Sequence, residues 1–122
     1  MRVQVLDFTT NTAGAATTLG NTVVGKVYSV VYIPGTTDTG ATVTITAEGA
    51  MSYPILVKAT AGTSNVVFYP RSLVHSNTDG AALTGTSGGD RAQPFIAGGL
   101  KLVIASGGAV KTGKVIVAID DE

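Results

Sequence analysis

Apolar and polar positions alternate along most of the chain, and this pattern predicts β-strands. The clearest stretch is "ATVTITAE", residues 41–48, in which Val43, Ile45 and Ala47 share one face. The opposite face carries threonines and Glu48. A strand of this kind buries one side and presents a row of threonines to water or to a partner. "RVQV", residues 2–5, alternates in the same way.

Two further stretches are apolar on both faces, and a third stretch is long. "KLVIA" (101–105) and "KVIVAI" (114–119) are nearly free of polar residues, which predicts strands covered on both sides. "VGKVYSVVYI" (24–33) is the longest period-2 stretch. Simple alternation places these four residues on one of its faces: Lys26, Tyr28, Val30 and Tyr32.

Turn-forming residues separate the predicted strands. "PGTTDTGA" (34–41), "TAGTSN" (60–65) and "SGGAVKTG" (106–113) favour hairpin-type connections. The stretch from 69 to 94 has weak strand character, although "AALT" within it fits a short strand or a helical turn. A loop of that length is usually functional or an interaction arm.

These elements predict a single all-β domain over residues 1–122. About seven or eight strands at this spacing indicate an antiparallel β-sandwich or a jelly-roll-like barrel with one long loop. The polar segment around residues 9–21 is expected to be a loop or a flexible arm that orders against a neighbour.

The composition favours contact with other protein subunits. Charged residues make up 13% of the chain, with eight basic and eight acidic side chains, against the ~25% usual in soluble domains. With no net charge, nothing draws the chain to nucleic acid or to an anionic membrane. Apolar runs such as "VVYI" (30–33) are far too short to span a bilayer, and the start lacks the unbroken apolar run of a signal peptide. So few charges are best explained by a surface that partner subunits cover.

One stretch resembles a nucleotide-binding loop. In "GGAVKTGKVIVAI" (107–119), Gly108, Gly113 and Lys114 match G-x-x-x-x-G-K. A working loop needs Ser or Thr after the lysine, and a helix whose amino end faces the phosphates. Here Val115 follows, and the next residues favour a strand, so we expect a turn without a nucleotide.

No other pattern predicts an enzyme, a cofactor or a metal centre. His75 is the only histidine. The alternative to an ordinary loop histidine is a base that, with Asp79 nearby, activates Ser72 or Ser76, but no nucleophile motif accompanies it, so we expect the loop histidine. The carboxylates are scattered and cysteine is absent, which leaves a calcium ion shared between subunits as the open metal alternative. There is no tryptophan to stack on a sugar, and the arginines are isolated from aromatic residues, unlike those of a nucleic-acid site.

Three long stretches together resemble a known class of protein: "VYIPGTTDTGATVTITAEG", "ILVKATAGTSN" and "FYPRSLVHSNTDGAALTGTSGGDRAQPFIAGGLKLVIASGGAVKTGKVIV". They are similar to small β-rich decoration, or cement, proteins encoded among the head genes of tailed bacteriophages, over about residues 28–117. The resemblance implies a structural virion protein, made in the host cytoplasm, that binds the major capsid protein on the outside of the shell in many copies, often as a homotrimer. It implies no active site.

The expected contact residues lie in the polar segment near the start and in the long loop. They are Asn11, Thr12, Thr17, Thr18, Arg71, His75 and Arg91. Two other functions remain open. One is a structural protein of the phage tail or fibre base. The other is a module that binds glycans or a bacterial surface through its tyrosines.

Overall fold

The computed structural model describes residues 2–48, 53–73 and 91–120, and within these ranges every regular element is a strand. This confirms the all-β class. The strands are β1 (Arg2–Thr9), β2 (Ala16–Ile33), β3 (Thr42–Glu48), β4 (Tyr53–Lys58), β5 (Val66–Phe68), β6 (Ser72–Leu73), β7 (Arg91–Ala92), β8 (Phe95–Ala105) and β9 (Thr112–Asp120).

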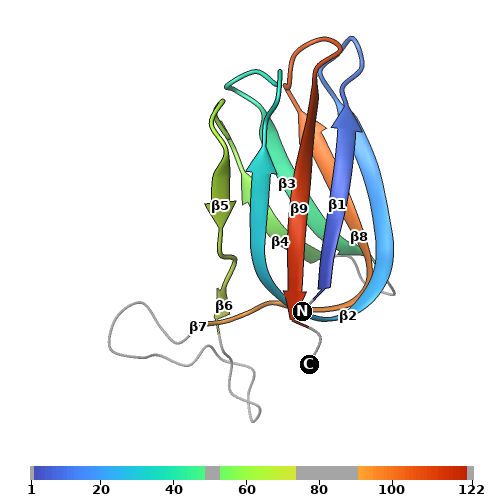
Figure 1. Ribbon diagram of the computed structural model, residues 1–122, viewed down its shortest axis with the longest axis vertical. Coiled ribbons are helices and arrows are strands. Elements are labelled where there is room, and N and C mark those ends of the chain that lie inside the picture. Colours follow the sequence, from blue (N-terminus) through green and yellow to red (C-terminus); the bar gives the residue numbers. More distant parts are fainter. Residues whose placement is uncertain (1, 49–52, 74–90, 121–122) are drawn as a thin grey trace.

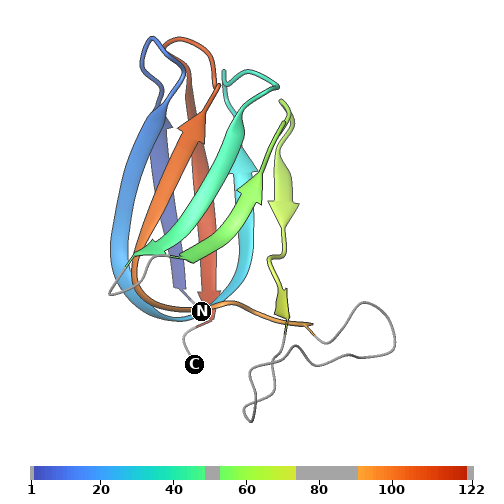
Figure 2. The same cartoon turned by 180° about the vertical axis from the view of Figure 1, so that it is seen from behind.

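Strand β2 is shared by two packed sheets, which we call sheet A and sheet B. It is 18 residues long, and its second half pairs with β9 and β5 whereas its first half pairs with β8. Sheet A therefore has the order β1-β9-β2-β5 and sheet B the order β2-β8-β3-β4, and all their pairings are antiparallel. Figures 1 and 2 show the two layers from opposite sides. Eight strand segments in two facing sheets, with the chain crossing repeatedly between them, make a jelly roll.

An irregularity in β2 decides which of its residues face the core. The pairing with β9 shifts by one residue between Val27 and Ser29, a β-bulge. Beyond the bulge Val30 and Tyr32 are fully buried, whereas Lys26 and Tyr28 before it are exposed. The prediction that these four residues share a face is wrong, because one extra residue reverses the alternation.

The core lies between the sheets and consists mainly of aliphatic side chains from the inward positions of the strands, together with Phe8 and Tyr32. Fully burying one such side chain stabilises the fold by about 1.5–3 kcal/mol. Its largest fully buried members are Tyr32, Ile45, Ile96, Leu100, Leu102, Ile104 and Ile119.

The outward positions of β8 and β9 are less covered than their apolar sequence predicts. Val103 and Ile116 are half-buried, whereas their neighbours Leu102 and Val117 are fully buried. Within the described chain these two strands are covered on one side only, so the prediction of cover on both sides is not met by the chain itself.

The predicted hairpins are wrong, although the turns are where the sequence indicates. The connections at 34–41, 59–65 and 106–111 each join a strand of one sheet to a strand of the other. The connection at 10–15 does the same between β1 and β2. Turn residues encode a reversal of the chain and not the sheet that the next strand joins. All four arches lie at one end of the sandwich, the upper end in Figure 1, which we call the arch end.

The segment expected to be a loop or flexible arm is mostly strand. Residues 16–21 belong to β2, and the chain turns within 10–15. Asn11 organises this turn, since its side-chain Oδ1 accepts hydrogen bonds from the main-chain N–H groups of Ala13 (2.9 Å) and Ala15 (3.1 Å).

The long loop begins and ends at the opposite end of the molecule. Strands β6 and β7 pair there, and the carbonyl of Pro94 accepts a hydrogen bond from the N–H of Val27 (2.9 Å). The short element expected at "AALT" lies outside the described residues.

The glycine of the apparent nucleotide-binding loop has a packing role, which substitution tests. A Cβ at Gly113 would lie 2.6 Å from Cζ of Phe8 and 2.8 Å from the carbonyl oxygens of Ile33 and Pro34. Gly113→Ala is expected to lower the free energy of unfolding by about 1–3 kcal/mol, because the added methyl group overpacks the site. Urea denaturation measures this change. Gly40→Ala is the matched control, since a Cβ there meets nothing within 4 Å. Equal stability of the two variants would contradict the packing role.

Candidate interaction surfaces

The first and last arches are joined by hydrogen bonds at the arch end. The buried hydroxyl of Thr10 donates to the carbonyl of Gly108 (2.6 Å) and accepts from the N–H of Lys111 (2.7 Å). The N–H of Thr10 donates in turn to the carbonyl of Lys111 (2.8 Å), and the N–H of Val110 to the carbonyl of Asn11 (3.2 Å). One threonine therefore satisfies main-chain groups of a loop about a hundred residues away.

The other two arches continue this network. The N–H of Asp38 donates to the carbonyl of Gly107 (3.0 Å), and the N–H of Thr112 to the hydroxyl of Thr36 (2.9 Å). The arch at 59–65 joins through the N–H of Ala61, which donates to the carbonyl of Ala41 (2.9 Å). The four arches thus form one hydrogen-bonded layer over the end of the core.

The arch end also holds strained main chain. Thr60, Ser106 and Val110 have φ values of 52°, 57° and 52°, in the left-handed region. Each non-glycine residue there costs roughly 1–2 kcal/mol. All three side chains are exposed, and Val110 is exposed by 64%.

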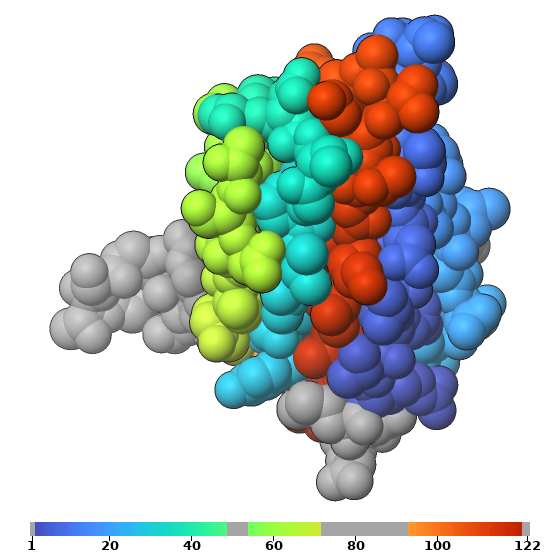
Figure 3. Space-filling view, turned by 45° about the horizontal axis from the view of Figure 1, so that its top comes forward, coloured from blue at the N-terminus to red at the C-terminus, as the bar shows by residue number. Residues whose placement is uncertain are grey.

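The outer face of sheet A carries an aliphatic row that crosses all four strands. The strand register places Val5 opposite Ile116, Ile116 opposite Val31 and Val31 opposite Val67. Val5 is exposed by 52% and Val67 by 45%, and the two central residues are half-buried. Figure 3 shows the four strands side by side across this face, from β5 through β2 and β9 to β1. An aliphatic row of this width on the outside of a sheet is a candidate docking surface.

Sheet B differs from sheet A in its outer face. The outward residues of β3 are Thr42, Thr44, Thr46 and Glu48, all half-buried, as the sequence pattern predicts. Glu48 approaches Lys101 of β8 to 3.7 Å. Sheet B also exposes apolar side chains, among them Leu19, Val24, Val57 and Phe95. The polar side chains of β3 interrupt the rows across sheet B, however, so that the unbroken aliphatic row lies on sheet A.

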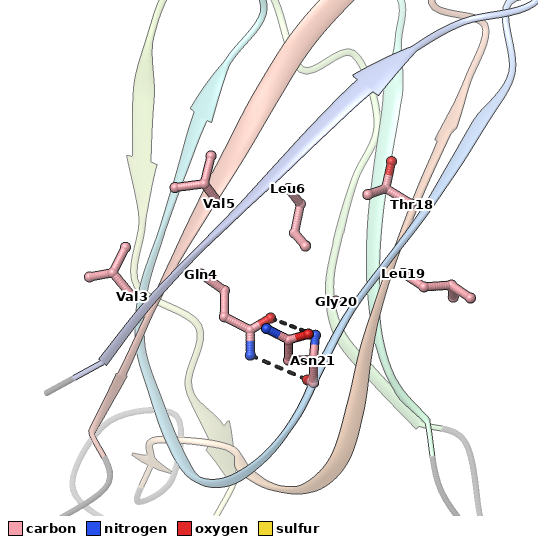
Figure 4. Close-up of a pocket in the computed structure, with 8 residues that line it drawn as sticks. All are labelled: Val3, Gln4, Val5, Leu6, Thr18, Leu19, Gly20 and Asn21. Carbon is pink, nitrogen blue, oxygen red and sulfur yellow. Dashed lines mark hydrogen bonds between the residues drawn. The ribbon is translucent and has the colours of Figure 1, made fainter.

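A shallow hollow lies where β1 and the first half of β2 run side by side. It has a volume of about 270 Å³ and is lined by Val3–Leu6 and Thr18–Asn21. Figure 4 shows the amide of Gln4 turned toward Asn21, where it accepts from the N–H (3.0 Å) and donates to the carbonyl (3.2 Å). These two hydrogen bonds connect β1 to the first half of β2 in place of main-chain pairing between them. A Cβ at Gly20 would lie 2.6 Å from Oε1 of Gln4, so glycine leaves room for this contact.

Arg71, one of the expected contact residues, is held in an aromatic cluster. Its guanidinium Nη1 donates to the carbonyls of Pro70 (2.6 Å) and Tyr28 (3.1 Å), and its Cζ lies 5.9 Å from the centre of the Tyr28 ring. The rings of Tyr28 and Tyr69 meet edge to face at 86°, with centroids 6.0 Å apart. This arrangement stabilises the start of the long loop and does not offer two coplanar rings to a sugar.

The structure places the other expected contact residues at separate points. Asn11 and Thr12 are exposed at the arch end, and Thr17 is exposed on β2. The hydroxyl of Thr18 donates to the carbonyl of Asp7 (2.8 Å), which bridges β1 and β2.

Besides Arg71, two of the expected contact residues belong to the long loop. Arg91 forms part of β7, and His75 lies outside the described residues. Among the described members of the expected set, Asn11 and Thr12 lie at the arch end, whereas Arg71 lies at the start of the long loop. The aliphatic row on sheet A was missed, because residues on four strands become neighbours only through the strand register.

The structure also bears on the phosphate-binding loop and the metal site that the sequence analysis considered. Lys114 lies within β9, whereas a phosphate-binding loop needs a helix to begin there. Within the described ranges no three His, Asp or Glu side chains gather as metal ligands, and no helix could cross a bilayer. No family model matches the chain, and neither the curated proteins nor the solved structures include a detectable match.

The link between the first and last arches can be tested at Thr10. Thr10→Val keeps the shape of the side chain but leaves the Lys111 N–H and the Gly108 carbonyl without their partner. We expect a loss of about 1–3 kcal/mol in the free energy of unfolding, measured by urea denaturation. Thr12→Val, at an exposed position of the same arch, should change it by less than about 0.5 kcal/mol. A Thr10→Val variant as stable as the wild type would show that the link does not support the fold.

A buried tyrosine predicts a pH dependence. Burial raises the pKa of Tyr32 above its ordinary value of 10.0, and the neighbouring hydroxyl of Thr37 partly offsets this shift. The unfolded chain then ionises at lower pH than the folded one, so the contribution to stability is complete below pH 10 and declines as the pH rises further. Tyr32→Phe should therefore lose less stability than the wild type between pH 9 and pH 11, measured by urea denaturation. Equal losses would exclude Tyr32 as the cause.

Proposed function

We propose that this protein is a structural virion protein that binds the outer surface of a phage capsid and stabilises it by bridging shell subunits. The observation that carries the proposal is the exposed aliphatic row across sheet A, from Val5 to Val67. A surface of this kind gains free energy when a partner covers it, at roughly 25 cal/mol per Å² of apolar area.

The rest of the molecule is consistent with this role. A decoration protein needs a rigid body, a docking face and no chemistry of its own, and the hydrogen-bonded arches supply rigidity at one end of the sandwich. Small contacts suffice when many copies act together on one shell. The proposed partner is the major capsid protein, the proposed location is the capsid surface, and a homotrimer is the proposed assembly.

The first experiment counts copies. Quantitative mass spectrometry of purified particles of the virus that encodes this chain should give about one copy for each major capsid subunit. A handful of copies per particle would instead indicate a tail or vertex protein. Absence from the particles would overturn the structural role and favour the alternative of a module that binds glycans or a bacterial surface.

The docking face can be tested with matched lysine substitutions. Val5→Lys and Val67→Lys place a charge in the aliphatic row, whereas Val57→Lys places one on β4 of sheet B at a valine that is 60% exposed. All three variants should keep the wild-type melting temperature to within a few degrees, because the valines are exposed.

Binding to shells purified without this chain separates the variants. The two sheet A variants should bind at least about tenfold more weakly than the wild type, since an apolar contact is lost and a lysine must be desolvated. Val57→Lys should bind like the wild type. If all three variants lost binding equally, sheet A would not be the docking face.

A further inference from the structure

Val110 combines strained main chain with an exposed apolar side chain. Its φ of 52° is unfavourable for a β-branched residue, and the side chain is too exposed to repay that cost through the core. Two residues earlier the same arch uses Gly108 at a φ of 88°, where glycine carries no such penalty. A branched apolar residue held in this conformation indicates a contact outside the fold.

We propose that Val110 is an anchor residue that inserts into a small apolar pocket of the shell subunit. This inference rests on the proposed function and extends its docking surface from sheet A to the arch end. Residue 110 lies two positions before β9, the strand that contributes Ile116 to the aliphatic row. A partner that covers sheet A along β9 therefore reaches the arch that carries Val110.

The arch holds Val110 in place before any partner binds. The N–H of Val110 donates to the carbonyl of Asn11. At the next residue, the N–H of Lys111 donates to the hydroxyl of Thr10, and this hydroxyl also lies within hydrogen-bond distance of the Lys111 carbonyl. A side chain presented by rigid main chain loses little conformational freedom on binding, which favours its use as an anchor.

The surroundings of Val110 include both small and charged side chains. Its exposed neighbours Asn11, Thr12, Ala13 and Ala109 are small or uncharged, whereas Lys111 follows it directly and the carboxylate of Asp38 lies against Gly108. Protein interfaces commonly have an apolar centre and a polar rim. The partner pocket is therefore expected to be apolar at its base and polar at its edge.

Two substitutions at Val110 separate strain from contact. Val110→Gly relieves the main chain and removes the side chain, so the melting temperature should rise by roughly 3–6 °C while binding to purified shells weakens at least about tenfold. Val110→Thr keeps the branched shape and the strain, so its melting temperature should stay within about 3 °C of the wild type. Its binding should still weaken, because a hydroxyl enters an apolar pocket.

Thr60→Gly is the matched control. Thr60 is exposed, belongs to a neighbouring arch and has the same φ of 52°. Its melting temperature should rise like that of Val110→Gly, but its binding to shells should equal that of the wild type.

The possible outcomes distinguish this inference from the proposed function. Wild-type binding with equally tight binding of Val110→Gly would overturn the anchor and leave the decoration role intact. An unchanged melting temperature of Val110→Gly would show that the main chain at Val110 is not strained, and this would contradict the inference. Failure of the wild-type chain to bind shells would overturn both proposals.

Discussion

The hydrogen bonds among the four arches are the constraint on which the rest of this structure depends. Each arch carries main chain from one sheet to the other across the end of an aliphatic core, where unpaired N–H and carbonyl groups would be costly. Thr10 and Thr36 meet this requirement with their hydroxyls, and main-chain bonds join the remaining arches. Because all four crossings are tied together, the positions of the two sheets are fixed at one end, and the shared strand β2 links them along its length.

This construction leaves the two outer faces free to differ. Threonines and an ion pair interrupt the apolar positions of sheet B, whereas an unbroken aliphatic row crosses sheet A. Covering such a row with a partner is favourable, and the row therefore supports a role in assembly. Strained Val110 lies in the arch that leads from β8 of sheet B into β9 of sheet A, next to the end of the proposed docking face.

Several features of the site were beyond the reach of sequence patterns for definite physical reasons. Alternation identified the Thr face of β3 but failed across residues 27–29 of β2, because a bulge leaves no mark in composition. Turn residues located the arches but predicted hairpins, since a local reversal does not specify a partner strand. Arg71 and Thr18 were expected at an interface, and the structure uses both for bonds within the chain.

Sequence patterns were enough to predict the all-β class, the positions of most strands and turns, and a strand in place of a phosphate-binding helix around Lys114, because each of these follows from local periodicity and local backbone preference. Tertiary structure alone decided which strands pair. That choice set the jelly-roll order, placed Val5, Ile116, Val31 and Val67 in one row, and brought Thr10 to the last arch. Such contacts join residues far apart in the chain, and their selection depends on the packing of the whole core and not on any single stretch.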